Sequence, residues 1–456
     1  MIRKSSIGSV YVIIVALFAS ASASAETLEQ VLSLAYAKNA DINAQRAAVR
    51  AADENVAGAN AGFQPRVSLS GTAGGNQVYY TAPNYALSGT QQLVPRSYGL
   101  TIVQNLYNGD QTSNQVKIAN SGVLGARAEL ESTESLVFLD AITKYVDVIR
   151  DASVARLMKN NLDVLTEQLR ETQVRYDVGD INNTGLAQVK AQLAAAEADL
   201  NNAETNLTIS RASFAKIVGT EPADLKPIDT PLKKLPHSLD EAVAQSLKNN
   251  PKIQSLAYNE SVAELNIQLA EGALKPSVDI VGSASQQWDY QFQNDQMNDL
   301  SLLGKVTVPL YEGGEANAHT RRAKELLGQR QLESEALRAS LRSQVTAAWE
   351  QFRNTEARIK SATTQIESAK IASTSVRSEF QVGQSTTLDV LISVQNELSA
   401  ELNLATAKHD QIVSAYQVLA LTGKLSAAEF GIKTKGFDAE AHYNATQKRI
   451  FGTDIK

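Results

Sequence analysis

The side chains that most often carry enzymatic or metal chemistry are few in this chain, and they are not grouped. The four histidines, His237, His319, His409 and His442, lack the three- or four-residue spacing that places two imidazoles on one face of a helix. The chain has no cysteine, which excludes disulfides, thiolate metal sites and lipid attachment at an N-terminal Cys. No GxSxG, Walker or GxGxxG motif occurs. We therefore predict no catalytic, cofactor or metal site, and we expect each histidine to be solvated or to cap a helix.

The elements that could position any functional group occur twice along the chain. Leu28–Ile42 reappears as Leu239–Ile253 about 211 positions later, whereas Tyr176–Gly179 returns as Phe380–Gly383 about 204 positions later. The spacing changes between Pro65 and Asn105, which indicates a surface loop that differs in length between two copies of one unit. The predicted organisation is a first repeat at 26–220, a proline-rich connector at 221–237, a second repeat at 238–423 and an unrepeated tail at 424–456.

The N-terminus is typical of a secretory signal peptide over residues 1–25. Arg3 and Lys4 precede an apolar stretch, Val10–Ala19, and the small residues Ala23-Ser24-Ala25 come before Glu26. The apolar stretch is shorter than the roughly 20 residues that a membrane-spanning helix needs. Without the two basic residues the formal charge changes from -6 to -6 - 2 = -8, and this mild acidity argues against a nucleic-acid partner.

Each repeat is predicted to run helix, strand, loop, strand, very long helix, tight turn, helix. The apolar residues of the long helices recur at spacings of three, four and seven, which favours helices that supercoil around their neighbours. A helix of about 70 residues is about 105 Å long, and two helices of about 36 residues laid end to end match it. We therefore expect each long helix to lie beside two stacked short ones. The predicted helices are Thr27–Gly62, Gly109–Asp177 and Thr184–Gly219, then Leu239–Leu274, Gly313–Gln381 and Leu388–Gly423.

The predicted strands alternate apolar with small polar residues. In Arg66–Gly74, Val67 and Leu69 lie on one face and Ser68 and Ser70 on the other, and Val278–Ser285 repeats this pattern. Such alternation is typical of outer-membrane strands, although a half-buried hairpin of a soluble protein also shows it. Aromatic residues gather near the strand ends, at Tyr79, Tyr80, Tyr85, Trp288, Tyr290 and Phe292. Four strands cannot close on themselves, and lipid does not tolerate open edges, so the chain must pool strands with one or more further chains.

Several motifs together resemble the TolC family of outer-membrane efflux and secretion channels over roughly residues 26–423. They are the strand-to-helix junctions LYNGD (Leu106–Asp110) and LYEGGE (Leu310–Glu315), and the Val-Gly turns that precede TGLAQVKAQL (Thr184–Leu193) and TTLDVLISVQNEL (Thr386–Leu398). The resemblance implies a homotrimer in the cell outer membrane with a shared 12-stranded β-barrel and a periplasmic α-barrel of long, coiled-coil-like helices. The implied fold class is thus an α+β membrane protein with an internal two-fold repeat and four transmembrane strands per chain.

The resemblance also implies a docking site at the helical tips. The tip turns are Val178-Gly179-Asp180 and Val382-Gly383-Gln384, and family members bind a periplasmic adaptor there, together with an inner-membrane transporter. Each glycine also supplies the positive φ that a helix end requires, and both roles can hold at once.

A second implied site is the tunnel aperture. Family members commonly place an Asp after a Thr on the first tip helix, and an aromatic residue and an Arg near the second, and these hold the tunnel shut. Here Gly185 follows Thr184, the aromatic residue is Phe380, and Ser385 stands at the Arg position. Three polar partners are missing, so we expect helix packing to hold the tunnel closed and Phe380→Ala or Ser385→Ala to leave its conductance nearly unchanged.

Asp389 is retained at the aperture. In a trimer its three copies would form a ring of carboxylates that attracts cations; alternatively, each copy only stabilises the N-terminus of its own helix.

The function indicated by the resemblance is passive export. The leading hypothesis is the outer-membrane channel of a tripartite efflux system for drugs, detergents and bile salts. The channel of a type I protein secretion system has the same tunnel physics and remains open as an alternative. A periplasmic adaptor is disfavoured because it lacks paired amphipathic strands, and a soluble coiled-coil protein is a third possibility.

Overall fold

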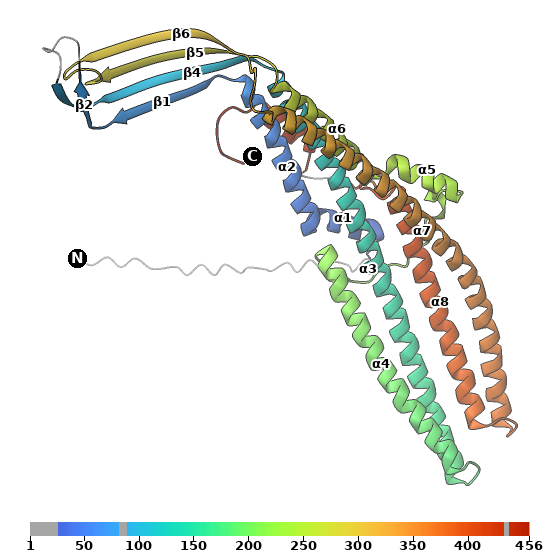
Figure 1. Cartoon of the computed structure of the whole chain (residues 1–456). Coiled ribbons are helices and arrows are strands. Elements are labelled where there is room, and N and C mark those ends of the chain that lie inside the picture. Colours follow the sequence, from blue (N-terminus) through green and yellow to red (C-terminus); the bar gives the residue numbers. More distant parts are fainter. Residues whose placement is uncertain (1–25, 82–88, 433–436, 456) are drawn as a thin grey trace, which may run out of the picture.

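The computed structural model describes residues 26–81, 89–432 and 437–455. The predicted signal peptide and Tyr85 lie outside these ranges. The chain is a long rod with a curved β-sheet at one end and two helical hairpins whose turns form the other end (Figure 1). Within the described ranges, no helix combines the length and the apolar character needed to cross a membrane.

The two halves of the chain have the same order of main helices and strands; they differ in one hairpin, in the short 3₁₀ helices and in the helix of the C-terminal tail. Both halves combine long helices with strands of a small sheet, as the predicted α+β class requires. The extra hairpin, β2–β3, lies between Pro65 and Asn105, where the sequence indicated a difference in length. The first half contains α1 (Leu28–Lys38), α2 (Ala40–Asn60), η1 (Ala61–Phe63), β1 (Arg66–Ala73), β2 (Asn76–Tyr80), β3 (Gly89–Leu93), β4 (Arg96–Asn108), α3 (Gln111–Asp177) and α4 (Asn183–Val218). The second contains η3 (Leu232–Lys234), α5 (Leu239–Asn249), α6 (Pro251–Gly272), β5 (Ser277–Trp288), β6 (Gln296–Thr307), α7 (Glu315–Gln381), α8 (Thr387–Leu421) and α9 (Ala439–Thr446).

The prediction of one unbroken helix at the start of each repeat is wrong. Asn39 separates α1 from α2, and Asn250 separates α5 from α6, each with its side chain capping the following helix. Each asparagine also donates its amide to a carbonyl at the end of a distant helix, Asn39 to Ile217 (3.2 Å) and Asn250 to Leu421 (3.0 Å). Asparagine is a favoured N-cap, and Pro251 starts the second helix because its missing N–H costs nothing in the first turn.

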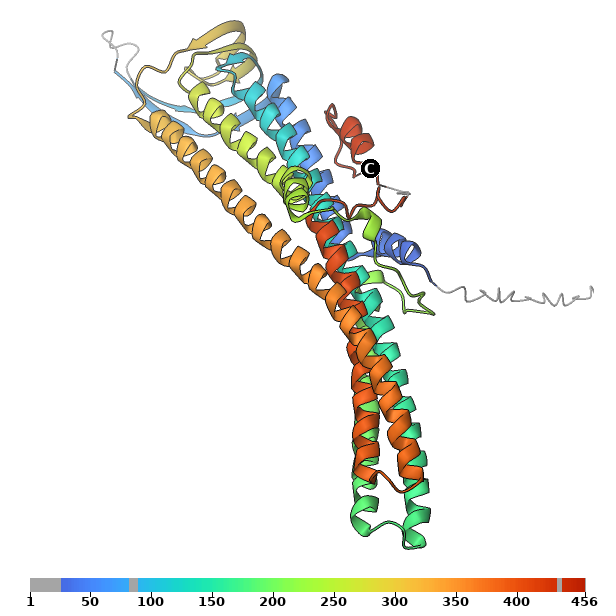
Figure 2. The same ribbon diagram turned by 90° about the vertical axis from the view of Figure 1, so that its right-hand side faces the viewer.

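The long helices confirm the predicted lengths. Both α3 and α7 contain 67 residues, so each is about 100 Å long. α3 packs against α2 near the sheet and against α4 toward the tip, and α7 packs in the same way against α6 and α8 (Figures 1 and 2). Each long helix therefore lies beside two shorter ones, as expected.

The sheet is antiparallel with the strand order β1-β4-β5-β6. Its register places apolar side chains on one face, with Val67, Ile102, Gly282 and Leu302 in one row. The alternate row is Ser68, Thr101, Ser283 and Ser301, in which the Oγ atoms of Ser283 and Ser301 are 2.7 Å apart. Apolar residues such as Leu69 and Leu300 remain exposed in the single chain. The sheet thus has an apolar and a polar face, and β1 and β6 each have a free edge.

The main apolar core lies midway along the rod, where the connector between the halves crosses the helices. Phe138 and Phe214 are fully buried there together with Tyr145. The Tyr145 hydroxyl donates to the carbonyls of Glu26 (3.0 Å) and Lys226 (2.7 Å), and burial raises its pKa to about 12. Toward the tips only a small core remains, built on Leu165, Val189, Ala196 and Leu391. The hairpins α3–α4 and α7–α8 are therefore joined by fewer apolar contacts than the middle of the rod.

The tail after residue 424 packs on the first half of the chain. In α9, His442 Nδ1 lies 2.7 Å from a carboxylate oxygen of the fully buried Asp53 on α2, and the Tyr443 hydroxyl donates to Asn120 (2.8 Å). His237 and His319 are exposed, as expected. The same expectation is wrong for His442 and His409, because both imidazoles are largely buried against aspartates.

Candidate functional site at the helical tips

Both tip turns have the same backbone geometry. Gly179 and Gly383 have φ of 81° and 79°, which side chains rarely adopt. In the first turn Asp180 N–H donates to the Arg175 carbonyl (2.8 Å), and in the second Gln384 N–H donates to the Glu379 carbonyl (2.9 Å). These bonds are the Schellman pattern that ends a helix at a glycine. The glycines thus have the structural role that the sequence indicated.

The turns present apolar side chains to solvent. Val178 is 76% exposed and Val382 is 71% exposed. A Cβ added at Gly179 or Gly383 would meet no atom within 4 Å. Both turns are therefore open surfaces in the single chain, available to a partner.

Gly185 is a close-packed position. A Cβ at this residue would lie 2.8 Å from Ile181 Cγ2 and 3.3 Å from Thr387 Oγ1 on the other hairpin. Thr184 beside it is exposed. A side chain at this position would require Ile181 of the same turn to shift and Thr387 of the other hairpin to give slightly, which fits glycine at a position where the resembling family commonly has aspartate.

Asp389 forms a capping box with Thr386 at the start of α8. Its carboxylate accepts from Thr386 N–H (2.9 Å), and its own N–H donates to Thr386 Oγ1 (3.3 Å). Hydrogen bonds from the Thr386 side chain and backbone lower the pKa of Asp389, so this exposed carboxylate is charged at neutral pH. The helix-terminus role of Asp389 is thus present in the single chain, while the predicted ring of carboxylates remains a prediction.

The structure reveals a contact between the two tips that the sequence did not indicate. The Arg175 guanidinium lies 4.6 Å from the centroid of the Phe380 ring, and its Nη1 donates to the Phe380 carbonyl (3.3 Å). Asp180 lies 3.7 Å from the same nitrogen, and the Phe380 side chain is 4% exposed. A signal was available, because the repeat aligns Arg175 with Glu379, a reversal of charge between the copies.

Ser385 has only a local contact in the described structure. Its hydroxyl donates to Glu379 Oε2 (2.7 Å) within the same turn. Arg175 therefore joins the hairpins, whereas Ser385 organises the end of α7. The partner of Phe380 is Arg175, and the expectation that Phe380→Ala leaves the conductance unchanged did not include this contact.

A solved structure shares this architecture. The outer membrane channel CmeC of Campylobacter jejuni superposes with a TM-score of 0.78 at 15% identity, covering 92% of this chain and 89% of that one. The fold, with its two-faced sheet and paired helical hairpins, is that of an outer-membrane channel.

The sequence comparisons identify the family. The profile of the outer membrane efflux protein family matches residues 31–220 and 242–424. The outer membrane efflux protein BepC of Brucella suis is 34% identical over 434 residues, covering 94% of this chain and 92% of the relative. The outer membrane protein TolC of Vibrio cholerae is 25% identical over 417 residues, covering 88% and 92%. The chain belongs to the outer membrane efflux protein family and is an outer-membrane channel protein with a periplasmic extension, which confirms the resemblance found in the sequence.

Proposed function

We propose that this protein is the outer-membrane channel of a tripartite efflux system, a passive conduit that exports drugs, detergents and bile salts. The observation that carries the proposal is a sheet with one apolar and one polar face, continuous at Asn108 with a helix about 100 Å long. The apolar face suits lipid and the polar face suits a water-filled lumen. The helices then extend the lumen into the periplasm.

The free edges of β1 and β6 support assembly from several chains. Unpaired backbone groups are not tolerated in lipid, so β1 of one chain must pair with β6 of another. Three chains give 12 strands, enough to surround an open passage, whereas eight strands leave an interior filled by side chains. We therefore propose a homotrimer in contact with outer-membrane lipid.

The exposed turns support docking at the tips. Val178 and Val382 give each chain two small apolar surfaces, and Asp180 and Gln384 add polar groups beside them. Apolar surface centred on a few residues and bordered by polar groups is typical of an interaction site. We propose that the hairpin of a periplasmic adaptor binds both turns and links the channel to an inner-membrane transporter, while Thr184, Gly185, Phe380, Ser385 and Asp389 line the aperture.

The test is a deletion strain assayed in parallel for drug and detergent susceptibility and for its secreted proteins. Increased susceptibility with an unchanged secretome supports efflux. Loss of a secreted protein with unchanged susceptibility would instead support a type I secretion channel and overturn the proposal.

Complementation separates the conduit from its docking site. Val178→Asp combined with Val382→Asp introduces charge at both turns, and we expect the protein to reach the outer membrane without restoring resistance. Val174→Asp is the matched control, because Val174 is an exposed residue on α3 close to the first turn. Full resistance with the double variant would contradict docking at these turns.

A further inference from the structure

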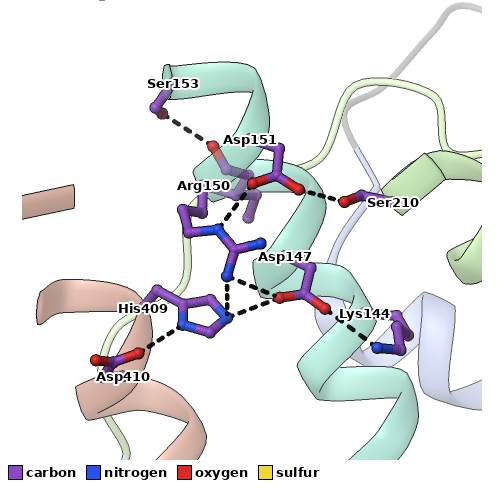
Figure 3. Close-up of polar contacts among 9 residues, drawn as sticks. Lys144, Asp147, Arg150, Asp151, Ser153, Ser210, His409 and Asp410 are labelled. Carbon is purple, nitrogen blue, oxygen red and sulfur yellow. Dashed lines mark hydrogen bonds and ion pairs between the residues drawn. The ribbon is translucent and has the colours of Figure 1, made fainter. Parts of the chain in front are cut away.

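A charged network joins four helices at the tipward end of the main core. The buried apolar residues of the core extend toward the tips as far as Val148 on α3 and Ala415 on α8. The network beside this end of the core contains Lys144, Asp147, Arg150 and Asp151 on α3, His409 and Asp410 on α8, Arg358 on α7 and Ser210 on α4. Figure 3 shows the imidazole of His409 between Asp147, Arg150 and Asp410.

His409 is the centre of this network. Its Nε2 lies 2.9 Å from Asp147 Oδ1 and its Nδ1 lies 3.0 Å from Asp410 Oδ1, and the side chain is only 11% exposed. Among the ion pairs of the described residues, His409–Asp147 is the one that joins the hairpin α7–α8 to the hairpin α3–α4. A titratable group therefore stands at the contact between the two halves of the tip region.

The geometry distinguishes two protonation states of His409. Both ring nitrogens face carboxylate oxygens, and only the imidazolium has two N–H groups to donate to both. A neutral ring donates to one aspartate and directs a lone pair at the other. If Nε2 is the bare nitrogen, it can accept only the longer bond from Arg150 Nη1 (3.4 Å). The arrangement is thus complete only when His409 is protonated.

The neighbouring charged side chains do not supply the hydrogen bond that the second N–H of His409 donates. Burial acts to raise the pKa of Asp147, but the hydrogen bond from His409 and the charges of Arg150 and Lys144 outweigh it and hold that pKa below its usual value. Asp147 therefore stays ionised throughout the range from pH 5 to 8, and its contribution to stability is lost only at lower pH. Arg150 is held by Asp151, and Arg358 is held by Asp410 at 2.9 Å. Histidine is the side-chain type whose ordinary ionisation falls within that range, so the geometry of His409 is the part of this network that a proton can alter.

We propose that His409 is a proton-operated lock between the two tip hairpins, which rests on the proposed function as an export tunnel. When protonated, His409 bonds α8 to Asp147 on α3 and holds the hairpins together. When it loses the proton, the ring can no longer donate to both carboxylates and its charge no longer attracts Asp147, so the hairpins separate more readily. Acidification of the periplasm would therefore favour the closed tunnel.

The absence of cysteine permits a direct test by spin labelling. Glu171→Cys on α3 and Asn396→Cys on α8 place labels at exposed sites toward the tips. The purified assembly, with labelled chains diluted by unlabelled ones, is followed by double electron–electron resonance between pH 5.5 and 8.0. We expect the ratio of close to separated labels to fall about tenfold as the pH rises, because the hydrogen bond between His409 and Asp147 loses the charge of the imidazolium.

Three variants make the test specific. His409→Gln should remove the pH response, and Asp147→Asn should reduce its size several-fold because the charged partner of His409 is gone. His442→Gln is the matched control, a histidine paired with Asp53 elsewhere, and it should keep the response. A response that survives in His409→Gln, or no response in the unmutated protein, would overturn the proposal.

Two further outcomes are informative. If His409→Gln fails to assemble, a response of undiminished size in Asp147→Asn overturns the proposal instead. The labels report distance and not export, so a deletion strain with normal drug susceptibility would refute the proposed function without altering this result.

Discussion

The contact between Arg175 and Phe380 predicts a specific effect on tunnel opening. Arg175→Gln removes the cation above the Phe380 ring and the donor to its carbonyl. A cation–π contact contributes about 0.5–1 kcal/mol at exposed sites, and a hydrogen bond from a charged group about 1.5–3 kcal/mol. The bond here is long at 3.3 Å, and the Arg175 side chain is 27% exposed, so we take about 1.5 kcal/mol for the two contacts together. The ratio of joined to separated hairpins then falls about tenfold in each chain.

The assay is single-channel recording in planar bilayers. If three chains must separate together, the effects multiply to as much as about a thousandfold, and the mean conductance of Arg175→Gln should rise well above that of the unmutated channel. Arg170→Gln is the matched control, since Arg170 is on the same helix and pairs only with Glu167, one turn away on an exposed surface. A conductance of Arg175→Gln equal to that of Arg170→Gln would refute the reasoning.

The contact with Arg175 changes the expected effect of substituting Phe380. We now expect Phe380→Ala to raise the conductance, because it removes a buried ring that the guanidinium covers. Phe380→Leu keeps much of the apolar volume but not the π face, so its effect should lie between those of the unmutated protein and Phe380→Ala. Equal conductance in all three proteins would show that helix packing alone closes the tunnel, as first expected.

Three further predictions concern single positions. Gly179→Ala should destabilise the first tip by about 1 kcal/mol through its positive φ, whereas Gly122→Ala inside α3 should stabilise the helix by about 0.5–1 kcal/mol; thermal unfolding distinguishes the two signs. Asn39→Ala removes a helix cap and a bond to Ile217, so the midpoint of unfolding should fall, with a cost of about 1–2 kcal/mol; an unchanged midpoint would contradict the capping role. Ser385→Ala loses only a local bond, and its conductance should match that of the unmutated channel.

The long helices and the strand alternation could be predicted because their signals are local. No proline interrupts α3 or α7, and their observed ends agree with the predicted ones within two residues. The breaks at Asn39 and Asn250 were missed because asparagine is tolerated within a helix, and only the distant carbonyls of Ile217 and Leu421 make it a cap in both copies.

The contacts that join the two hairpins could not be predicted from sequence patterns. Arg175 and Phe380 are 205 positions apart, and Asp147 and His409 are 262 apart. Neither pair has a motif, because each partner is an ordinary residue of a solvated helix until the fold brings the helices together. For the histidines, isolation in the sequence indicated solvation, yet the structure shows His409 buried between two aspartates and His442 buried against one.

Because α3 is continuous, a small change in its direction in the middle of the rod produces a large displacement at the tip. Thirty residues, or about 45 Å of helix, separate Asp147 from the last residue of α3. A tilt of about 5° at Asp147 would therefore displace the tip by about 4 Å, more than the diameter of a water molecule. The width of the aperture therefore changes with small changes in helix angle in the middle of the molecule. Contacts between helices in that region govern its opening together with the residues that line it.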